Sequence, residues 1–306
     1  MEALARAKAN LALAVLGRRA DGFHDLVSVF VRLDLADRVT VEVASGGADR
    51  LAAHGPVAYQ PRADDLVLRA ASELRKAHRP DAPGLAFGLE KHIPLGAGLG
   101  GGSADAAAAL GLAAAAWSLD LSAAERLALA TRLGSDVPFM AADVDAALVT
   151  GRGEHVEALS GPQGAIGVVL VTAGPSMATR DVFAAWDAAG EGGRPGTAGA
   201  SSDRARGLAA QLAAGCSAAD LAGMAVALHD ANDLWPIAAR LRPELPALRA
   251  AIEARLDRPV LLSGSGPTLL ALYPSPTAAA SAAADLGARP IDGVEPRAVR
   301  VASIGA

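Results

Sequence analysis

The sequence predicts an α+β protein with two domains. Its 306 residues are enough for two domains, and 52% of them are hydrophobic, which is ample for sizeable cores. The first 45 residues contain apolar segments with the two-residue spacing of strands, whereas the later strands alternate with helical segments. A glycine loop separates a strand from an alanine-rich segment at residues 94–117. We expect the domain boundary near residue 155, which gives domains 1–155 and 156–306.

Hydrophobic spacing and helix caps predict the elements of the first domain. Strands are predicted at residues 11–15, 26–35, 38–44, 85–89 and 146–149. Helices are predicted at residues 66–77, 104–117 and 122–133. Asp64 is the expected N-cap of the first helix, and Ser122 with Glu125 has the spacing of a capping box at the third. Residues 134–139 are predicted to form a sharp turn.

The second domain is predicted to mix strands and helices. Strands are expected at residues 166–172, 260–262, 269–273 and 298–303. Helices are expected at residues 179–186, 208–212, 217–229, 247–255 and 278–286. Residues 188–207 are rich in Gly, Ala, Ser and Pro, and we expect them to form an exposed, mobile loop.

Composition excludes several classes of function. The net charge of −5 and the lack of a basic stripe argue against nucleic-acid binding. No apolar stretch is both long and non-alanine enough to predict a membrane span, and Lys8 and Asn10 interrupt the faint signal-peptide pattern at the start. The single cysteine, Cys216, excludes an intrachain disulfide and is typical of a reducing compartment. We therefore expect a cytoplasmic protein, either a monomer or a weak homodimer.

The glycine loop is the strongest functional signal. Five glycines lie within residues 96–102, directly before a segment built mostly from alanine, the best helix former. The start of a helix carries unpaired N–H groups and the positive end of the dipole, and glycine lets a ligand approach the backbone closely. This pattern predicts an anion site, and we expect the anion to be the phosphate chain of a nucleotide.

Two known nucleotide loops can be compared with this one. No Gly-Lys-Ser or Gly-Lys-Thr ends the loop, so it is not a Walker A sequence. Gly96, Gly98 and Gly101 have the spacing of a dinucleotide fingerprint, and Asp120 lies where that fold places its ribose-binding acid. However, residues 91–95 separate the strand from the first glycine, and no parallel α/β pattern surrounds it. A dinucleotide oxidoreductase stays open as an alternative.

Residues 94–107 resemble the phosphate loop of the GHMP kinases, which include galactokinase and the homoserine, mevalonate and phosphomevalonate kinases. Further motifs similar to that family lie at residues 8–11, 17–24, 134–139, 151–154, 232–234 and 263–268. The resemblance implies an N-terminal domain like ribosomal protein S5 that carries the phosphate loop and a C-terminal ferredoxin-like α+β domain. It also implies an active site in the interdomain cleft, and ATP and Mg²⁺ as cofactors, with unknown metal ligands.

The turn at residues 18–24 resembles one branch of the family in particular. That branch uses ATP to phosphorylate the C2 hydroxyl of a methylerythritol linked to cytidine diphosphate, in the non-mevalonate isoprenoid pathway. Mevalonate and homoserine kinases lack this Arg-Arg-x-Asp-Gly-aromatic-His turn. Two alternatives remain open, namely another GHMP small-molecule kinase of the mevalonate or homoserine type and a non-catalytic, ligand-sensing protein of the same fold.

The resemblance assigns catalytic roles to Asp136 and Lys8. Asp136 matches the catalytic base, although an aspartate before Pro138 also suits a plain turn. Lys8 matches the catalytic lysine, which would keep that carboxylate ionised and polarise the attacking hydroxyl. A solvated charge is the alternative for Lys8, but only three of the 28 Lys and Arg residues are lysines, so its presence is informative. We expect positioning and charge neutralisation to supply most of the rate.

The resemblance also assigns residues to the two substrates. Those assigned to the phosphate acceptor are Asn10, Phe23, His24 and Thr179. Those assigned to the nucleotide are Asp65, Leu66, Lys91, Pro94, Gly96, Ala97, Gly98, Leu99, Gly100, Gly101, Gly102 and Ser103. Ser103 is also a candidate Mg²⁺ ligand.

The acceptor residues have structural alternatives of their own. Phe23 and His24 would form a cytosine pocket, in which Phe23 stands where the family usually has tyrosine. A core phenylalanine and a surface histidine are the alternatives, and for Thr179 the alternative is a helix N-cap. Asn10 would support Lys8 and the acceptor.

Two of the residues assigned to the nucleotide also have alternative interpretations. Lys91 matches a lysine near the nucleotide, with a surface charge as the alternative. Asp65 stands where the family more often has an asparagine that faces adenine, and an ionised aspartate cannot donate hydrogen bonds. Residues 263–266 are expected to approach the phosphate loop or the substrate.

Overall fold

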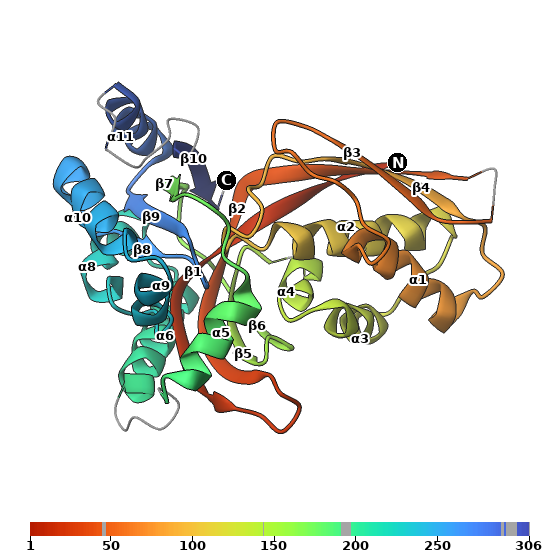
Figure 1. Ribbon diagram of the computed structural model, residues 1–306, viewed down its shortest axis with the longest axis horizontal. Coiled ribbons are helices and arrows are strands. Elements are labelled where there is room, and N and C mark those ends of the chain that lie inside the picture. The colour runs from red at the N-terminus through yellow and green to blue at the C-terminus, as the bar shows by residue number, and fades with distance from the viewer. Residues whose placement is uncertain (45–46, 143, 191–196, 289–290, 292–298, 306) are drawn as a thin grey trace. The chain divides into compact units, whose positions relative to one another are not determined.

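The computed structural model describes residues 1–44, 47–142, 144–190, 197–288, 291 and 299–305 (Figure 1). As predicted, the protein mixes helices and strands. The chain forms two compact units that are discontinuous in sequence. Unit 1 comprises Met1–Ala7, Leu35–Leu95 and Gly100–Asp143, and unit 2 comprises Lys8–Asp34, Gly96–Leu99 and Val144–Ala306. The units do not follow one break in the chain, so the division into 1–155 and 156–306 stays a prediction about sequence domains.

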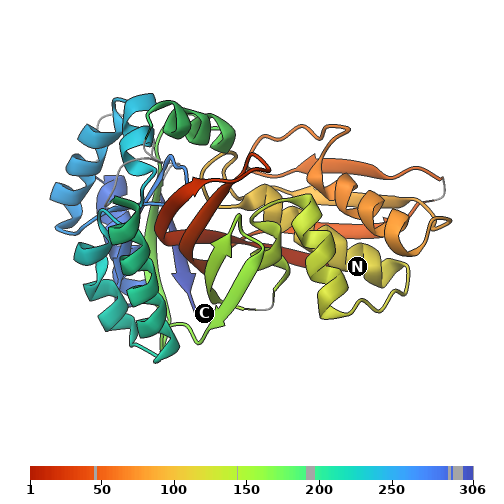
Figure 2. The same ribbon diagram turned by 90° about the horizontal axis from the view of Figure 1, so that it is seen from below.

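In unit 1, four helices pack against strands, some of which pair antiparallel and some parallel. The second half of β2 (His24–Val43) pairs antiparallel with β4 (Leu85–Glu90), and β3 (Arg50–His54) pairs parallel with β4. Alternate β4 residues are buried, as two-residue spacing requires. The helices are α1 (Leu66–His78), α2 (Gly101–Ala116), α3 (Ala123–Leu133) and α4 (Val137–Ala141). Figures 1 and 2 show them on one face of the strands, with α1 packed beside α2.

Unit 2 contains further strand pairs and a four-stranded antiparallel sheet. The first half of β2 pairs with β5 (Ala146–Gly151), and β5 pairs with β6 (His155–Leu159). The four-stranded sheet has the order β10-β7-β9-β8. Its strands are β7 (Ile166–Thr172), β8 (Leu261–Leu262), β9 (Thr268–Tyr273) and β10 (Val299–Ile304).

Seven helices are described in unit 2. They are α5 (Thr179–Ala188), α6 (Thr197–Ala213), α7 (Ala218–Gly223), α8 (Ala225–Leu228), α9 (Trp235–Leu241), α10 (Leu245–Leu256) and α11 (Pro276–Ala288). Leu13 of β1 (Glu2–Arg18), Val169 of β7 and Ile252 of α10 belong to one buried apolar cluster. The N-terminal strand is thereby tied to the core of the C-terminal part of the chain.

The predicted capping box is confirmed, whereas the expected N-cap of α1 and the expected break between two strands are wrong. The capping box of α3 is present, with Ser122 and Glu125 each accepting the other's backbone N–H. The N-cap of α1 is Asp65, not Asp64, because Asp65 Oδ1 accepts the N–H of Val67 at 3.0 Å. The two strands predicted at residues 26–35 and 38–44 are one strand, β2, in which the polar interruption at Asp37 is itself buried.

The predicted loop at residues 188–207 is also wrong over its second part. Residues 191–196 lie outside the described residues, but α6 begins at Thr197. Ala205, Leu208 and Leu212 are buried at helical spacing. Their packing overrides the poor helix propensity of a segment rich in glycine and serine.

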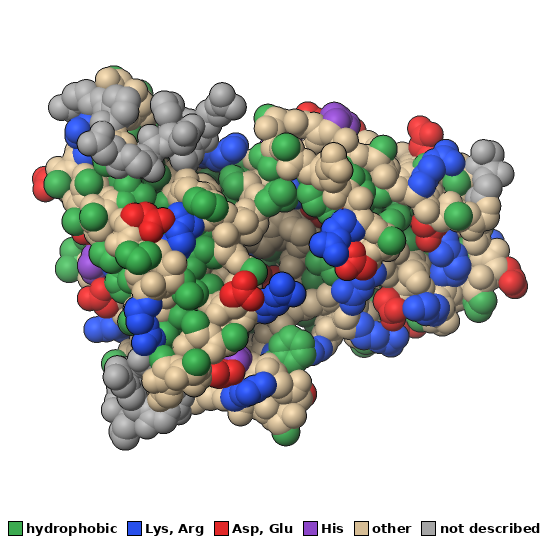
Figure 3. Space-filling view, viewed as in Figure 1, with side chains coloured by type: hydrophobic (Ala, Val, Ile, Leu, Met, Phe, Trp, Pro, Cys, Tyr) green, Lys and Arg blue, Asp and Glu red, His purple; other side chains and the backbone are tan. Residues whose placement is uncertain are grey.

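The surface agrees with the charge pattern of the sequence. On the face in Figure 3, basic side chains are interspersed with acidic ones and form no continuous stripe. Within the described ranges, none of the helices has both the length and the apolar character that a membrane crossing demands.

Candidate active site

The glycine loop has the backbone conformation that the sequence predicted for an anion site. Gly96, Gly98 and Gly100 have φ values of 57°, 75° and 70°, a left-handed region that favours glycine. Gly100 is the N-cap of α2 and supplies no side-chain cap, so the helix begins at Gly101 with its first-turn N–H groups uncapped by a side chain. Such a helix start attracts anions through its N–H groups and its dipole.

The first part of the loop, Gly96–Leu99, is embedded in unit 2. A Cβ on Gly98 would lie 2.2 Å from the carbonyl oxygen of Ser263, so no other residue fits there. Ser263 Oγ donates to the carbonyl of Gly98 at 3.0 Å, and Met177 N donates to that of Gly96 at 3.1 Å. Residues 263–266 therefore do approach the phosphate loop, as the sequence predicted.

Lys8 and Asn10 lie beside the same loop. Lys8 N donates to the carbonyl of Leu99 at 3.0 Å, and Lys8 Nζ donates to Asn10 Oδ1 at 2.5 Å. The Lys8 ammonium also lies 4.4 Å from the centre of the Phe30 ring. Lys8 is only 4% exposed, so its interpretation as a solvated charge is wrong. Asn10 N donates to Ser263 Oγ at 3.3 Å, which joins residues 253 positions apart.

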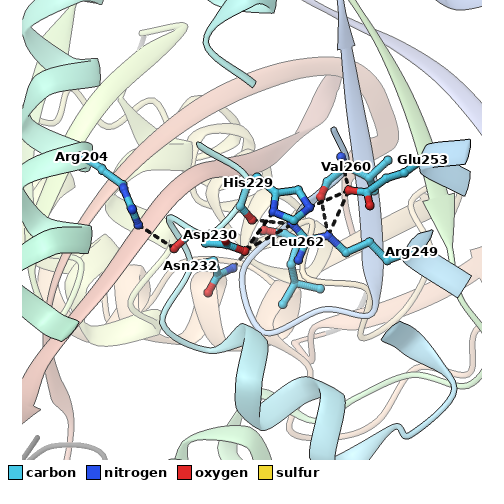
Figure 4. A network of polar contacts seen from close by, with 8 residues as sticks. All are labelled: Arg204, His229, Asp230, Asn232, Arg249, Glu253, Val260 and Leu262. Carbon is cyan, nitrogen blue, oxygen red and sulfur yellow. Dashed lines mark hydrogen bonds and ion pairs between the residues drawn. The ribbon is translucent and has the colours of Figure 1, made fainter. Parts of the chain in front are cut away.

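The Asn232 side chain hydrogen-bonds to the backbone at the 263–266 turn. Its Nδ2 donates to the carbonyls of Leu262 and Gly264, both at 2.9 Å (Figure 4). The same network includes Arg249, which donates to the carbonyls of Val260 and His229 at 2.8 and 2.5 Å. Arg249 was not predicted as a site residue, because the carbonyls that it binds lie 11 and 20 positions away along the chain.

Replacing Arg249 by methionine is expected to destabilise the fold by about 2–4 kcal/mol, since two buried carbonyls lose a donor that is itself only 4% exposed. Urea unfolding followed by circular dichroism measures the change. Arg206→Met, on an exposed position of α6, is the control and should leave the midpoint unchanged. Equal midpoints for the two variants would contradict this role of Arg249.

His24 is fixed from α5. Its Nε2 lies 2.7 Å from Asp187 Oδ1, and its ring stacks on Phe183 with centroids 4.7 Å apart. Trp186 meets the same ring edge-on at 5.4 Å. His24 is only 8% exposed, so its interpretation as a surface histidine is wrong. Phe183 was not predicted as a site residue, because its only sign in the sequence was its place in a predicted helix.

Phe23, in contrast, is 45% exposed, so its interpretation as a core residue is wrong. The guanidinium of Arg152 lies 4.6 Å from the centre of its ring. Arg152 N donates to Glu154 Oε2 at 2.6 Å, and Arg19 Nη1 lies 3.5 Å from Glu154 Oε1. These contacts tie the turn that carries Phe23 to the turn between β5 and β6. Arg152 was not predicted.

Thr179 is the first residue of α5, and its N-cap is Ala178, so the interpretation of Thr179 as an N-cap is wrong. Its Oγ1 lies 3.1 Å from Ser265 Oγ, next to the 263–266 turn. The hydroxyl is exposed.

Asp136 and Asp65 belong to unit 1. Asp136 is half-buried at the N-cap of α4, and its side chain makes no capping hydrogen bond. Asp65 accepts hydrogen bonds from Val67 N and from the Tyr59 hydroxyl, which donates to its second oxygen. Leu66, the first residue of α1, lies next to Gly102. A Cβ added to Gly102 would lie 3.8 Å from Leu66 Cδ1.

Lys91 is also in unit 1 and is 1% exposed, so its interpretation as a surface charge is wrong. Its ammonium contacts two carboxylates that the sequence analysis did not single out, Asp37 at 2.5 Å and Asp105 at 2.7 Å.

Among the residues that the structure describes, no three His, Cys, Asp or Glu side chains are grouped as a metal site. Mg²⁺ in nucleotide sites typically keeps waters and takes substrate phosphates as ligands.

Comparison with known proteins identifies the family. Residues 65–149 match the family model described as GHMP kinases N terminal domain, and residues 210–292 match GHMP kinases C terminal. The chain is 32% identical to a crystal structure of 4-(cytidine 5'-diphospho)-2C-methyl-D-erythritol kinase, with a TM-score of 0.71 and full coverage of both chains. Mevalonate kinase from L. major is 14% identical, with a TM-score of 0.74 over 99% of this chain and 95% of that one, and shares the fold. The predicted GHMP fold is confirmed.

Two bacterial relatives cover most of the chain. The 4-diphosphocytidyl-2-C-methyl-D-erythritol kinase of Rhodopseudomonas palustris is 41% identical over 288 residues, which are 92% of this chain and 90% of the relative. That of Bradyrhizobium diazoefficiens is 42% identical over 286 residues, with 91% and 90% coverage. The chain therefore belongs to the GHMP kinase family and, within it, to the 4-diphosphocytidyl-2-C-methyl-D-erythritol kinases.

Proposed function

We propose that this chain transfers the γ-phosphate of ATP to the C2 hydroxyl of 4-diphosphocytidyl-2-C-methyl-D-erythritol, giving the 2-phosphate and ADP. This reaction belongs to the non-mevalonate isoprenoid pathway. The observation that carries the proposal is the meeting, within unit 2, of Lys8 and Asn10, the glycine loop and the 263–266 turn. The names of the relatives specify the acceptor.

The glycine loop binds the phosphates of ATP through its backbone. Ala97 and Leu99 are 2% and 1% exposed, so their side chains anchor the loop in the core. Their backbone N–H groups donate to the phosphates of the nucleotide. Pro94 leads into the loop, and Gly100, Gly101 and Gly102 continue it into the first turn of α2. Leu66 and Asp65 border this turn from the start of α1 and bound the nucleotide there.

Asp136 receives the proton of the acceptor hydroxyl, and Lys8 neutralises charge at the transferred group. An aspartate is a weak base for an alcohol, so the proton leaves late, as suits a loose phosphoryl-transfer transition state. Positioning then matters most, and Asn10 fixes the Lys8 ammonium through its Oδ1 atom. The Ser103 hydroxyl, in the first turn of α2, would help to hold Mg²⁺ when the ion binds with ATP, and the ion would then supply further neutralisation of phosphate charge.

Phe23 and His24 select the cytidine end of the acceptor. The exposed Phe23 ring offers a stacking face for a base, and the buried, oriented His24 offers a polar ring atom for its edge. The Thr179 hydroxyl binds the diphosphate or sugar portion. Phenylalanine retains the stacking that tyrosine provides elsewhere in the family but not its hydroxyl group.

A Phe23→Ala variant is expected to raise the KM for the cytidine substrate by about ten- to a hundredfold, the usual loss for one stacked base. The KM for ATP should change little. Steady-state kinetics with each substrate varied in turn measures both constants. Phe23→Tyr, which keeps the ring, is the matched control. Equal increases in both KM values for Phe23→Ala would argue against a base-stacking role.

A coupled ADP-release assay tests the proposed function directly. The diphosphocytidyl substrate should support turnover, whereas mevalonate and homoserine should not. Turnover with mevalonate or homoserine alone would identify another GHMP kinase. Thermal protection by CMP without turnover on any acceptor would identify a ligand-sensing protein.

A further inference from the structure

Three charged side chains are buried together in unit 1. Lys91, Asp37 and Asp105 are 1%, 0% and 4% exposed. The Lys91 ammonium lies 2.5 Å from Asp37 Oδ2 and 2.7 Å from Asp105 Oδ2. Removing one member of such a buried ion pair leaves its partner as an uncompensated buried charge, which strongly destabilises the folded protein.

Asp37 connects the group to the segment that leads into the glycine loop. Its Oδ1 accepts the N–H groups of His92 and Ile93 at 2.5 and 2.8 Å. The Lys91 backbone is also engaged, since its N–H donates to the carbonyl of His54 at 2.8 Å. The carboxylate on β2 therefore fixes both the side chain of Lys91 and the course of the next two residues.

Asp105 connects the group to α2. One helical turn before it, the first residue of α2, Gly101, packs on the same atoms. A Cβ on Gly101 would lie 2.9 Å from Ile93 Cγ2 and 3.4 Å from Lys91 Nζ. The position of the first turn of α2 thus depends on Ile93 and Lys91. In the proposed function, the N–H groups of this turn bind the phosphates.

The Lys91 ammonium is the shared partner of two buried carboxylates. Burial lowers the pKa of Lys91, but the two carboxylates outweigh it and raise that pKa overall. Burial, opposed by Lys91 and assisted by Asp37, raises the pKa of Asp105 to about 7. Asp105 Oδ1 is buried without a hydrogen-bond partner among the described atoms.

We propose that Lys91 is a positioning residue that acts on ATP only through Asp37, Asp105 and the backbone of α2, and makes no contact of its own with the nucleotide. The Lys91 ammonium could bind a phosphate only if it left the two buried carboxylates. Those carboxylates would then lack a counter-charge. The proposal rests on the proposed function, because it assumes that the loop binds ATP.

Calorimetric titration with ADP tests the proposal on the wild-type protein and four variants. Lys91→Met and Asp105→Ala should each weaken ADP binding by about tenfold or more, because either change releases the first turn of α2. Asp105→Asn should bind within about twofold of wild type, since asparagine has nearly the same shape and its amide oxygen can still accept from the Lys91 ammonium. Lys76→Met removes an exposed lysine of α1 and should have no effect.

Asp105→Ala is the decisive variant, because it leaves Lys91 in place. Wild-type affinity in a folded Asp105→Ala protein would overturn the proposal and leave Lys91 as a direct phosphate ligand. Tenfold weakening in Asp105→Asn as well would also overturn it. If Lys91→Met fails to fold, the two Asp105 variants still decide. Failure of wild-type protein to bind ADP would instead refute the proposed function.

Discussion

An Asp136→Asn variant is expected to lose about 10³-fold in kcat, within the range that a general base contributes. The amide has the shape of the carboxylate but cannot accept the hydroxyl proton. The fold should be retained, because asparagine has nearly the same size and shape as aspartate. ADP affinity should remain near the wild-type value, since the variant leaves the glycine loop intact. ADP release and calorimetry measure the two quantities.

The matched control is Asp120→Asn, an exposed aspartate of unit 1. A dinucleotide fold would use this residue, whereas the kinase mechanism gives it no part, so its kcat should equal that of wild type. Unchanged turnover in Asp136→Asn would rule out Asp136 as the base.

Replacing Lys8 by methionine is expected to lower kcat by about 10²- to 10³-fold, the usual effect of removing one preorganised electrostatic contact. Methionine has a similar apolar stem, so it can occupy the buried position beside Phe30. The KM for ATP should change little, because the glycine loop binds the phosphates through its backbone. Steady-state kinetics separates the two constants.

Lys8→Arg should not restore the rate. Lys8 is 4% exposed and its ammonium lies 2.5 Å from Asn10 Oδ1, so a larger guanidinium does not fit. Lys76→Met, at an exposed site, controls for the loss of a lysine. A large rise in the KM for ATP at constant kcat would instead make Lys8 a nucleotide anchor.

Local structure was predictable where neighbouring residues decide it. The capping box of α3 depends on Ser122 and Glu125, three positions apart, and it is present. The N-cap of α1 was misplaced by one residue because Asp64 and Asp65 are equally good caps in sequence. A helix was predicted at residues 208–212, but the first part of α6, from Thr197, was missed because distant packing, rather than propensity, stabilises it.

The candidate site was predictable as a set of motifs but not as an arrangement. Glycines 96, 98 and 100 indicated a phosphate loop, yet the reason that Gly98 must be glycine is the carbonyl of Ser263. Phe183 and Arg152 escaped detection because aromatic and basic residues are common, and only contact with His24 and Phe23 distinguishes them.

The sequence by itself determined the α+β class and the glycine loop before α2, because these depend on residue types at short spacing, and its resemblance to the family singled out Lys8 and Asp136 as candidates. Only the tertiary structure decided what each charge does. Lys8 and Lys91 look alike in sequence, but one lies beside the glycine loop against Asn10, whereas the other is enclosed by Asp37 and Asp105. Burial and counter-charges act through space, between residues far apart in the chain, so spacing alone cannot reveal them.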